Sequence, residues 1–180
     1  MIVSQERVFQ MLINVLQTLF DYNTWANQRV FEEALHLSFQ QVAPDEQGQF
    51  DALYETLFHL VNAQHLWLAR CRETALPSEV KGNPPSGFLA LHHYWKQVDQ
   101  ETHTFVRAVD TLDLQRIIHY VNPQGEANAY PLWQLLYHQV NHAAQHRSEL
   151  AVSLTRFGRS PGWLDFLYYL DLRDGTTLHT

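Results

Sequence analysis

The chain has 180 residues, of which 46% are apolar and 13% aromatic, and this composition suits one domain, residues 1–180, with a sizeable core. Its 12 Lys and Arg against 19 Asp and Glu give a formal charge of −7, which argues against a nucleic-acid partner. The lone cysteine, Cys71, excludes an intrachain disulfide, and no apolar run is long enough to cross a membrane. We therefore predict a soluble, cytoplasmic protein that binds neither nucleic acid nor membrane.

The first predicted helix covers roughly Gln5–Leu35, where apolar residues recur every three or four positions. The expected core face consists of Val8, Leu12, Val15, Leu19, Tyr22 and Ala26. The later part of this helix contains the sequence DYNTWAN, in which Trp25 is expected to pack and Asn23 and Asn27 to be exposed or hydrogen-bonded. Residues 37–50 lack such a period and are predicted to form a connection.

A second helix is predicted over residues 53–73, with Asp51 as its N-cap. Its expected core side consists of Leu53, Leu57, Leu60, Trp67 and Leu68. His59 falls off that stripe, and the small side chain of Ala63 one turn away leaves room for a group to approach the imidazole. Taken alone, a histidine in such a place is more often a surface or hydrogen-bonded residue than a ligand.

The Pro-rich and Gly-rich residues 74–87 are predicted to form a second connection. A third helix should then run from about Gly87 to Val109, with Ser86 as its cap. The adjacent His92 and His93 point about 100° apart on a helix and cannot share one metal ion. We predict that this pair lies on the solvated surface.

Residues 115–130 carry β-branched and aromatic residues on both sides of the sequence NPQG at 122–125, which predicts a β-hairpin. Such a ribbon must lie against the helices because two strands are not stable alone. A fourth helix is predicted over Pro131–Gly158. Its apolar stripe consists of Leu132, Leu136, Val140, Ala143, Leu150 and Leu154. Ser160 as a cap and Pro161 in the first turn predict a short fifth helix.

His138, His142 and His146 recur every four residues in the fourth helix and therefore lie one above the other on a single face. At ~100° per residue this column flanks the apolar stripe, where a neighbouring helix can close over it. The column contains two HxxxH pairs, 138/142 and 142/146, so the periodicity alone fixes only His142 as part of a site. The alternative interpretation is that the helix is rich in histidine and exposed to solvent, and that the four-residue spacing arises by chance.

Together these elements predict an all-α fold, an up-and-down type four-helix bundle with a short β-hairpin before the last long helix and a short C-terminal helix. Metal sites in bundles are built from facing helices, and His59 is the best placed partner for an HxxxH pair. Three neutral imidazoles with open positions describe a catalytic rather than a structural metal site. We expect a divalent ion, zinc or nickel before iron or manganese.

Two carboxylates lie one helical turn from these histidines, Glu149 after His146 and Glu55 before His59. Each can serve as a general base or as the acceptor for an imidazole N–H, and we favour the second role. Cys71 lies about three turns from His59, so the chain offers no nucleophile near the column. The nucleophile of any reaction must then come from solution.

Three blocks of the sequence, DYNTWAN, LFHLVNAQHLWLAR and LYHQVNHAAQHRSEL, resemble those of the DinB family, which comprises damage-inducible four-helix bundles, in the same order and over almost the whole chain. The resemblance implies a divalent metal held by His59, His142 and His146. His138 would then have a neighbouring role one turn before the ligand pair. Family members usually follow the His–Arg dipeptide with Gly and Gln, where this chain has Ser and Glu at 148–149.

The resemblance also implies a metal-dependent enzyme that acts on a small molecule, either a transferase that uses a low-molecular-weight thiol or a hydrolase. Neutral histidines leave the ion its full positive charge, which favours a bound anion such as a thiolate or hydroxide. The family resemblance then favours thiol transfer slightly over hydrolysis. The alternative is a non-catalytic metal-binding or stress-response module. Exposed faces of the bundle leave room for a homodimer.

Overall fold

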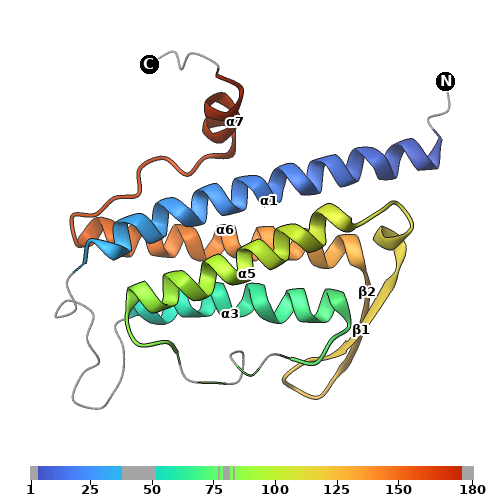
Figure 1. Cartoon of the computed structure of the whole chain (residues 1–180), viewed down its shortest axis with the longest axis horizontal. Helices are drawn as coiled ribbons and strands as arrows, with labels where there is room; N and C mark the ends of the chain where they lie inside the picture. Colours follow the sequence, from blue (N-terminus) through green and yellow to red (C-terminus); the bar gives the residue numbers. More distant parts are fainter. Residues whose placement is uncertain (1–3, 38–51, 77, 79–81, 83, 176–180) are drawn as a thin grey trace.

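The computed structural model describes residues 4–37, 52–76, 78, 82 and 84–175, and it is built on four long helices. These helices are α1 (Gln5–Leu35), α3 (Ala52–Arg72), α5 (Phe88–Ala108) and α6 (Leu132–Arg156). A two-stranded hairpin precedes α6 and the short helix α7 follows it, as Figure 1 shows. The predicted all-α bundle with a hairpin and a C-terminal helix is confirmed. Within the described residues, no helix has the length and apolarity needed to cross a membrane.

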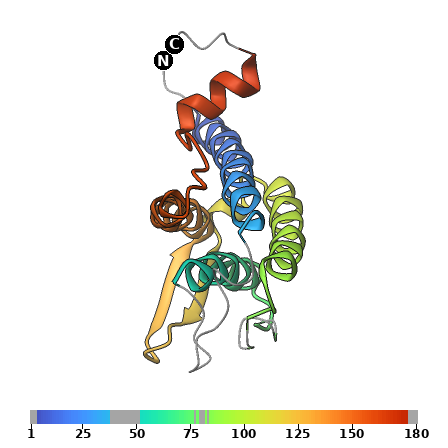
Figure 2. The ribbon, with the colours of Figure 1, turned by 90° about the vertical axis from the view of Figure 1, so that its left-hand side faces the viewer.

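Each long helix packs against two of the others. Both α5 and α6 lie between α1 and α3, so the order around the bundle is α1, α6, α3, α5, which Figure 2 shows nearly end-on. Thr24 on α1 donates a hydrogen bond to Asp99 on α5 at 2.8 Å. Arg72 on α3 forms an ion pair with Glu101 on α5 at 3.2 Å. The helix α6 therefore has α3 on one side and α1 on the other.

Neighbouring helices are not all antiparallel, as they would be in a strictly alternating bundle. Tyr54 near the start of α3 donates a hydrogen bond to the carbonyl of Pro85 just before α5. The Arg72–Glu101 pair joins the later parts of the same two helices, so α3 and α5 run in one direction. In contrast, α3 and α6 run antiparallel, which brings the middle of one beside the middle of the other (Figure 1).

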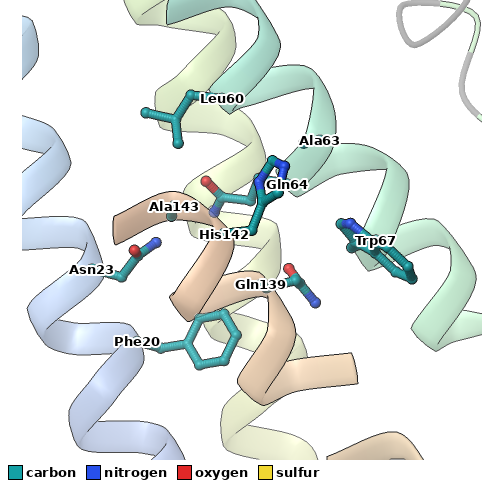
Figure 3. Close-up of a pocket in the computed structure, with 9 residues that line it drawn as sticks. All are labelled: Phe20, Asn23, Leu60, Ala63, Gln64, Trp67, Gln139, His142 and Ala143. Carbon is teal, nitrogen blue, oxygen red and sulfur yellow. The ribbon is translucent and has the colours of Figure 1, made fainter. Parts of the chain in front are cut away.

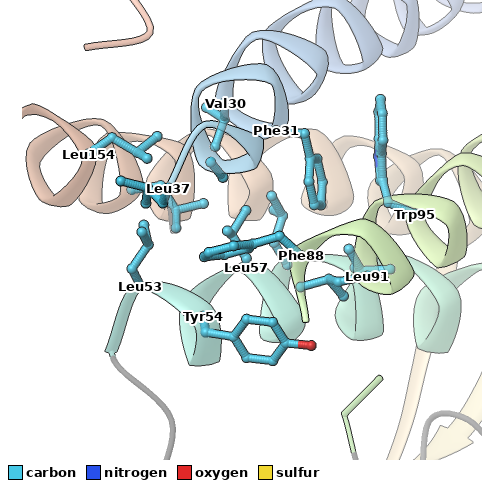
Figure 4. Close-up of a cluster of buried hydrophobic side chains, with 14 of the residues drawn as sticks. Val30, Phe31, Leu37, Leu53, Tyr54, Leu57, Phe88, Leu91, Trp95 and Leu154 are labelled. Carbon is cyan, nitrogen blue, oxygen red and sulfur yellow. The ribbon is translucent and has the colours of Figure 1, made fainter. Parts of the chain in front are cut away.

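The apolar core consists of two clusters, one toward each end of the bundle. The first joins the later part of α1 to the early parts of α3 and α5, as Figure 4 shows. It includes Phe31, Leu57, Trp95 and Leu154. The second joins the early part of α1 to the hairpin and the start of α6, and includes Leu16, Phe20, Ile118 and Leu136. Burying a side chain of this size contributes ~1.5–3 kcal/mol, so these clusters are the main source of stability.

Polar side chains are buried between the two clusters. On α1 these are Asn23 and Asn27, on α3 Gln64, and on α5 Asp99 and Thr102. The amide of Gln64 donates to a carboxylate oxygen of Asp99 at 3.3 Å and lies 3.2 Å from the hydroxyl of Thr102. Because buried polar groups are costly unless they are hydrogen-bonded, such contacts make a polar layer tolerable in the middle of the bundle.

The predicted core face is confirmed for α6, whereas on α1 it is correct for Ala26 and wrong for Val8 and Val15. All six residues of the α6 stripe are buried. On α1, however, Val8 and Val15 are 44% and 47% exposed, and the buried apolar residues in this part are Ile13, Leu16 and Phe20. Apolar residues form two overlapping stripes on this helix, and contact with α5 and α6 selects the stripe that includes Leu16 and Phe20.

The hairpin consists of β1 (Ile117–Val121) and β2 (Ala127–Pro131), paired antiparallel as predicted. At its turn the side-chain oxygen of Asn122 accepts hydrogen bonds from the backbone N–H groups of Gln124 and Glu126. This is the local bonding that favours Asn in turns. The strands lie against α3 and α6, which extends the wall of the bundle on that side (Figure 2).

The short helix α7 (Phe166–Asp174) begins later than predicted. Asp165, rather than Ser160, is its N-cap, and the carboxylate accepts hydrogen bonds from two backbone N–H groups of the first turn. Pro161 precedes the helix, and its carbonyl accepts a hydrogen bond from Arg29 on α1 at 3.0 Å. This contact with α1 holds residues before α7 in a non-helical conformation.

The start of α5 also differs from the prediction. Gly87 is the N-cap, with a φ of +83° that glycine adopts readily, and no side-chain capping bond is made there. Ser86 therefore does not cap this helix. Asp51, the predicted N-cap of α3, lies outside the described residues.

Candidate metal centre

Three histidines meet where the middle of α3 faces the middle of α6. The Nε2 atom of His142 lies 3.4 Å from Nε2 of His59 and 3.2 Å from Nε2 of His146. One ring nitrogen from each of the three falls within 4.8 Å of the others. His142 and His146 come from successive turns of α6, and His59 comes from the antiparallel helix α3. The structure thus brings together the three histidines that the sequence analysis selected.

The spacing of these nitrogens suits a bound metal ion. Four-coordinate zinc binds imidazole nitrogen at ~2.0–2.1 Å, so two such ligands in a tetrahedron lie roughly 3.3 Å apart. The two Nε2 separations at His142, 3.4 and 3.2 Å, lie on either side of that value. Imidazole nitrogen also binds nickel and ferrous iron. The donor set and its spacing therefore fit a divalent cation.

The protonation state of the cluster also suits a cation. Burial, followed by the proximity of His146, His59 and His138, lowers the pKa of His142 to about 4. Burial, followed by the proximity of His146, lowers the pKa of His59 as well. Near pH 7 these two imidazoles are neutral, and each has a nitrogen lone pair available for a metal.

Glu149 fixes the orientation of one imidazole. Its Oε2 atom lies 2.8 Å from Nδ1 of His146, one turn earlier on α6. An ionised carboxylate can only accept, so this hydrogen bond requires the proton on Nδ1 and leaves the lone pair of Nε2 facing His142. The structure thus supports the role of imidazole acceptor for Glu149. Glu55 is exposed in the first turn of α3, and its role stays a prediction.

His138 lies beside the cluster and not within it. Its ring packs edge-to-face against Trp67, with 4.7 Å between centroids, and lies 5.7 Å from the ring of His142. Burial, followed by the positive charge of Arg70, lowers the pKa of His138. Of the two HxxxH pairs that the periodicity left open, only 142/146 belongs to the close group of ring nitrogens.

A small polar cavity of about 10 Å³, the space of a single water molecule, lies on the inner side of His142. Figure 3 shows that its lining comes from α1, α3 and α6, with Asn23, Gln64 and Gln139 among the side chains. Gln139 donates a hydrogen bond to the sulfur of Cys71 at 3.7 Å. The cavity therefore places amide side chains as well as apolar ones beside His142.

Cys71 is not a nucleophile. The side chain is fully buried, and burial raises the pKa of the thiol to about 12, far above that of a reactive cysteine. The expectation that any nucleophile must come from solution therefore agrees with the structure.

Arg147 follows His146 directly in the sequence, but its side chain is buried and makes contacts within the bundle. It is 2% exposed, and its Nη1 donates hydrogen bonds to the side-chain oxygens of Asn23 and Asn27. Its guanidinium also lies 5.2 Å from the ring centroid of Tyr22. Of the two alternatives predicted for Asn23 and Asn27, the hydrogen-bonded one is thus correct. Arg147 was not identified from the sequence as their buried partner. Its burial could have been predicted, since Arg147 falls on the apolar stripe of α6.

The predicted solvent exposure of the pair His92–His93 is confirmed for one of the two residues only. His93 is exposed, but His92 is 7% exposed and packs against Phe31 and Trp95, with ring centroids 5.4 and 5.6 Å apart. The expectation of a solvated pair was therefore wrong for His92. An aromatic-rich helix face buries an imidazole as one more flat ring.

A helical bundle with three histidines gathered from facing helices defines a class of candidate metal-binding protein. A family model described as the DinB family matches residues 10–177, and the chain belongs to this family. It is similar to Protein DinB of Bacillus subtilis (strain 168), with 23% identity over 166 residues that cover 84% of this chain and 91% of that protein. The resemblance found in the sequence is thus confirmed.

Proposed function

We propose that His59, His142 and His146 bind one divalent metal ion and that the chain is a metal-dependent enzyme acting on a small molecule. The observation that carries this proposal is the convergence of three ring nitrogens from two helices at metal-ligand spacing. Three protein ligands leave at least one coordination position open, which is typical of catalytic rather than structural sites. The exposed position of His59 gives a small molecule access from solvent.

The reaction we favour is transfer of a low-molecular-weight thiol to an electrophile, before hydrolysis of an ester or amide. A bound zinc or nickel ion, or iron or manganese, would supply Lewis acidity that lowers the pKa of a thiol or water. A site of three neutral ligands keeps the full charge of such an ion, which favours an anionic nucleophile. Since Cys71 is buried with a high thiol pKa, the nucleophile comes from solution.

The protein residues have separate tasks in this proposal. His59, His142 and His146 hold the ion, and Glu149 accepts the Nδ1 proton of His146 and so keeps that ring in its orientation.

One observation favours a second function, that of a non-catalytic metal-binding module. Glu149 is engaged with His146, and within the described residues it is the acidic side chain that hydrogen-bonds to a cluster histidine. A carboxylate held in this way is poorly placed to act as a general base. Turnover separates the two functions.

The test is an activity assay on metal-loaded protein without a histidine tag. It is incubated with low-molecular-weight thiols and soluble electrophiles, and separately with esters and amides without thiol. We expect consumption of thiol and electrophile that is lost in His142→Ala and retained in His93→Ala, an exposed histidine outside the cluster. Thiol-independent hydrolysis lost in His142→Ala would favour the hydrolase, and the absence of any metal-dependent turnover would favour the binding module.

A further inference from the structure

We propose that a groove beside the histidine cluster binds a small aromatic molecule that carries a negative charge, and that Arg70 recognises this charge. The proposed binding is argued from the groove alone. The identification of the groove as the substrate site rests in addition on the proposed function. The groove lies between α3, α6 and the hairpin, next to His138.

The lining of the groove is aromatic and comes from four elements. It consists of Trp67 from α3, Tyr120 from β1, Tyr130 from β2, and Gln134, Leu135 and His138 from α6. Its volume of about 360 Å³ falls within the range of sites for small molecules, which are mostly apolar with a few polar groups. The groove therefore has the size and the composition of a small-molecule site.

The rings of the groove support one another. Trp67 makes edge-to-face contacts with Tyr120 and His138, with centroids 5.4 and 4.7 Å apart. Tyr120 and Tyr130 are stacked with centroids 6.3 Å apart, and Tyr130 is still 41% exposed. Ring pairs favour offset or edge-to-face geometry, so faces and edges that remain open can accept one more flat ring. This geometry selects a planar ligand over a branched aliphatic one.

A positive charge lies beside the groove on Arg70, which is not itself a lining residue. Its Cζ atom lies 4.5 Å from the ring centroid of Trp67 and 4.3 Å from that of Tyr120, and both of these rings line the groove. Within the described residues no carboxylate pairs with Arg70, and its hydrogen bond to the carbonyl of Val121 is long at 3.5 Å. In contrast, Arg72 two positions later is paired with Glu101. Arg70 thus carries a positive charge that aromatic faces hold in place and that a carboxylate or similar anion would complement.

The groove lies next to the histidine cluster. His138 belongs to the lining, and its ring lies 5.7 Å from the ring of His142. A flat molecule that places its anionic group near Arg70 and its ring along Trp67 would extend toward the cluster. The inference therefore gives the proposed enzyme a substrate class, an aromatic anion with its reactive end toward His142.

The test compares two probes of the same shape, 2-naphthoate and the neutral 2-naphthamide, by calorimetric titration of the full chain. We expect naphthoate to bind more tightly. In Arg70→Gln, naphthoate should bind about tenfold more weakly and naphthamide unchanged, because a hydrogen bond to a charged group is worth at least ~1.5 kcal/mol. Arg107→Gln, on the exposed face of α5, is the matched control and should leave both affinities unchanged. Trp67→Leu should weaken both probes.

Equal binding of the two probes to the wild type, or an unchanged preference in Arg70→Gln, would overturn the role of Arg70. Failure of both probes to bind would overturn the groove itself. His146→Ala separates this inference from the proposed function, because that variant should lose metal while it keeps its affinity for naphthoate. Retained naphthoate binding in a protein without metal-dependent turnover would support the groove and contradict the enzyme.

Discussion

His146 and Arg147 are adjacent on α6, yet they face different helices and have opposite environments. His146 faces α3, where three imidazoles crowd their ring nitrogens together in a partly exposed group. Arg147 faces α1, where it is 2% exposed and donates to Asn23 and Asn27. One side of the helix gathers ring nitrogens that can bind a cation, and the other holds the guanidinium cation against neutral amide oxygens.

This difference separates a site for chemistry from a structural contact. Buried charges are tolerated when they are hydrogen-bonded, and Asn23 and Asn27 accept hydrogen bonds from Nη1 of Arg147. Its Nη2 has no hydrogen-bond partner among the described residues, and the guanidinium lies against the ring of Tyr22.

Nε2 of His142 lies within 3.4 Å of Nε2 of both His59 and His146, but a single ring proton on His142 forms a well-aligned hydrogen bond with only one of them. A shared divalent ion satisfies all three at once. The histidine side thus offers a set of ligands for a cation, whereas the arginine side is a cation held by protein oxygens.

The strongest test of this comparison is removal of a partner of Arg147. Asn23→Ala should lower the free energy of unfolding by about 2 kcal/mol, because it leaves a buried charged donor without one of its acceptors. Metal content per folded molecule should be unchanged. Urea denaturation measures the loss, and Asn14→Ala, an exposed asparagine on the same helix, should cost little. Equal costs for the two variants would contradict the structural role of the Arg147 contacts.

A smaller effect is expected for the partner of His146. Glu149→Ala should weaken metal binding about tenfold, since removal of an acceptor for a ligating imidazole typically costs 10–100-fold. Competition with a chelator of known affinity measures this change. Glu55→Ala is the matched control, because Glu55 was the other carboxylate that the sequence placed near the cluster. A larger effect of Glu55→Ala than of Glu149→Ala would show that the assignment of the acceptor role to Glu149 is wrong.

Acidification should act on one side of the comparison alone. Burial lowers the pKa of His142 from 6.5 to about 4, so between these values the unfolded chain takes up a proton that the folded chain does not. Stability of the metal-free protein is therefore full above pH 6.5 and falls toward pH 4. Arg147 keeps its charge throughout. Urea midpoints at pH 7 and pH 5 should differ less in His142→Gln than in the wild type, and an identical difference would refute the assignment.

The smallest effect should follow removal of the metal. Chelation should leave the helical circular dichroism signal nearly unchanged, because two apolar clusters stabilise the bundle without an ion. Loss of that signal would mean that the free energy of metal binding is needed to fold the chain, as in a structural metal site.

The sequence predicted the elements well because each long helix repeats its apolar residues with a clear period. It misplaced the buried face of α1, where Ile13, Leu16 and Phe20 compete with Val15 and Leu19 for the core. The positions of α5 and α6, which the sequence does not give, determine which of the two apolar stripes of α1 is buried. The start of α7 was missed for a related reason, since contact with Arg29 holds Pro161 outside the helix.

The candidate site was predictable in part. The four-residue spacing fixed His142, and the family resemblance selected His59 and His146. What the spacing lacked was the position of α3 along α6, which places His138 opposite Trp67. The same position places His142 and His146 opposite His59. The groove was also beyond reach, because its lining combines one residue of α3 with residues of the hairpin and α6.

The measurement that tests the central claim most directly is the metal content of purified protein without a histidine tag. Elemental analysis should find one divalent ion per chain in the wild type and in His138→Ala. His59→Ala, His142→Ala and His146→Ala should each lose most of it. Equal metal content in all four variants, or a greater loss in His138→Ala than in His146→Ala, would contradict the account.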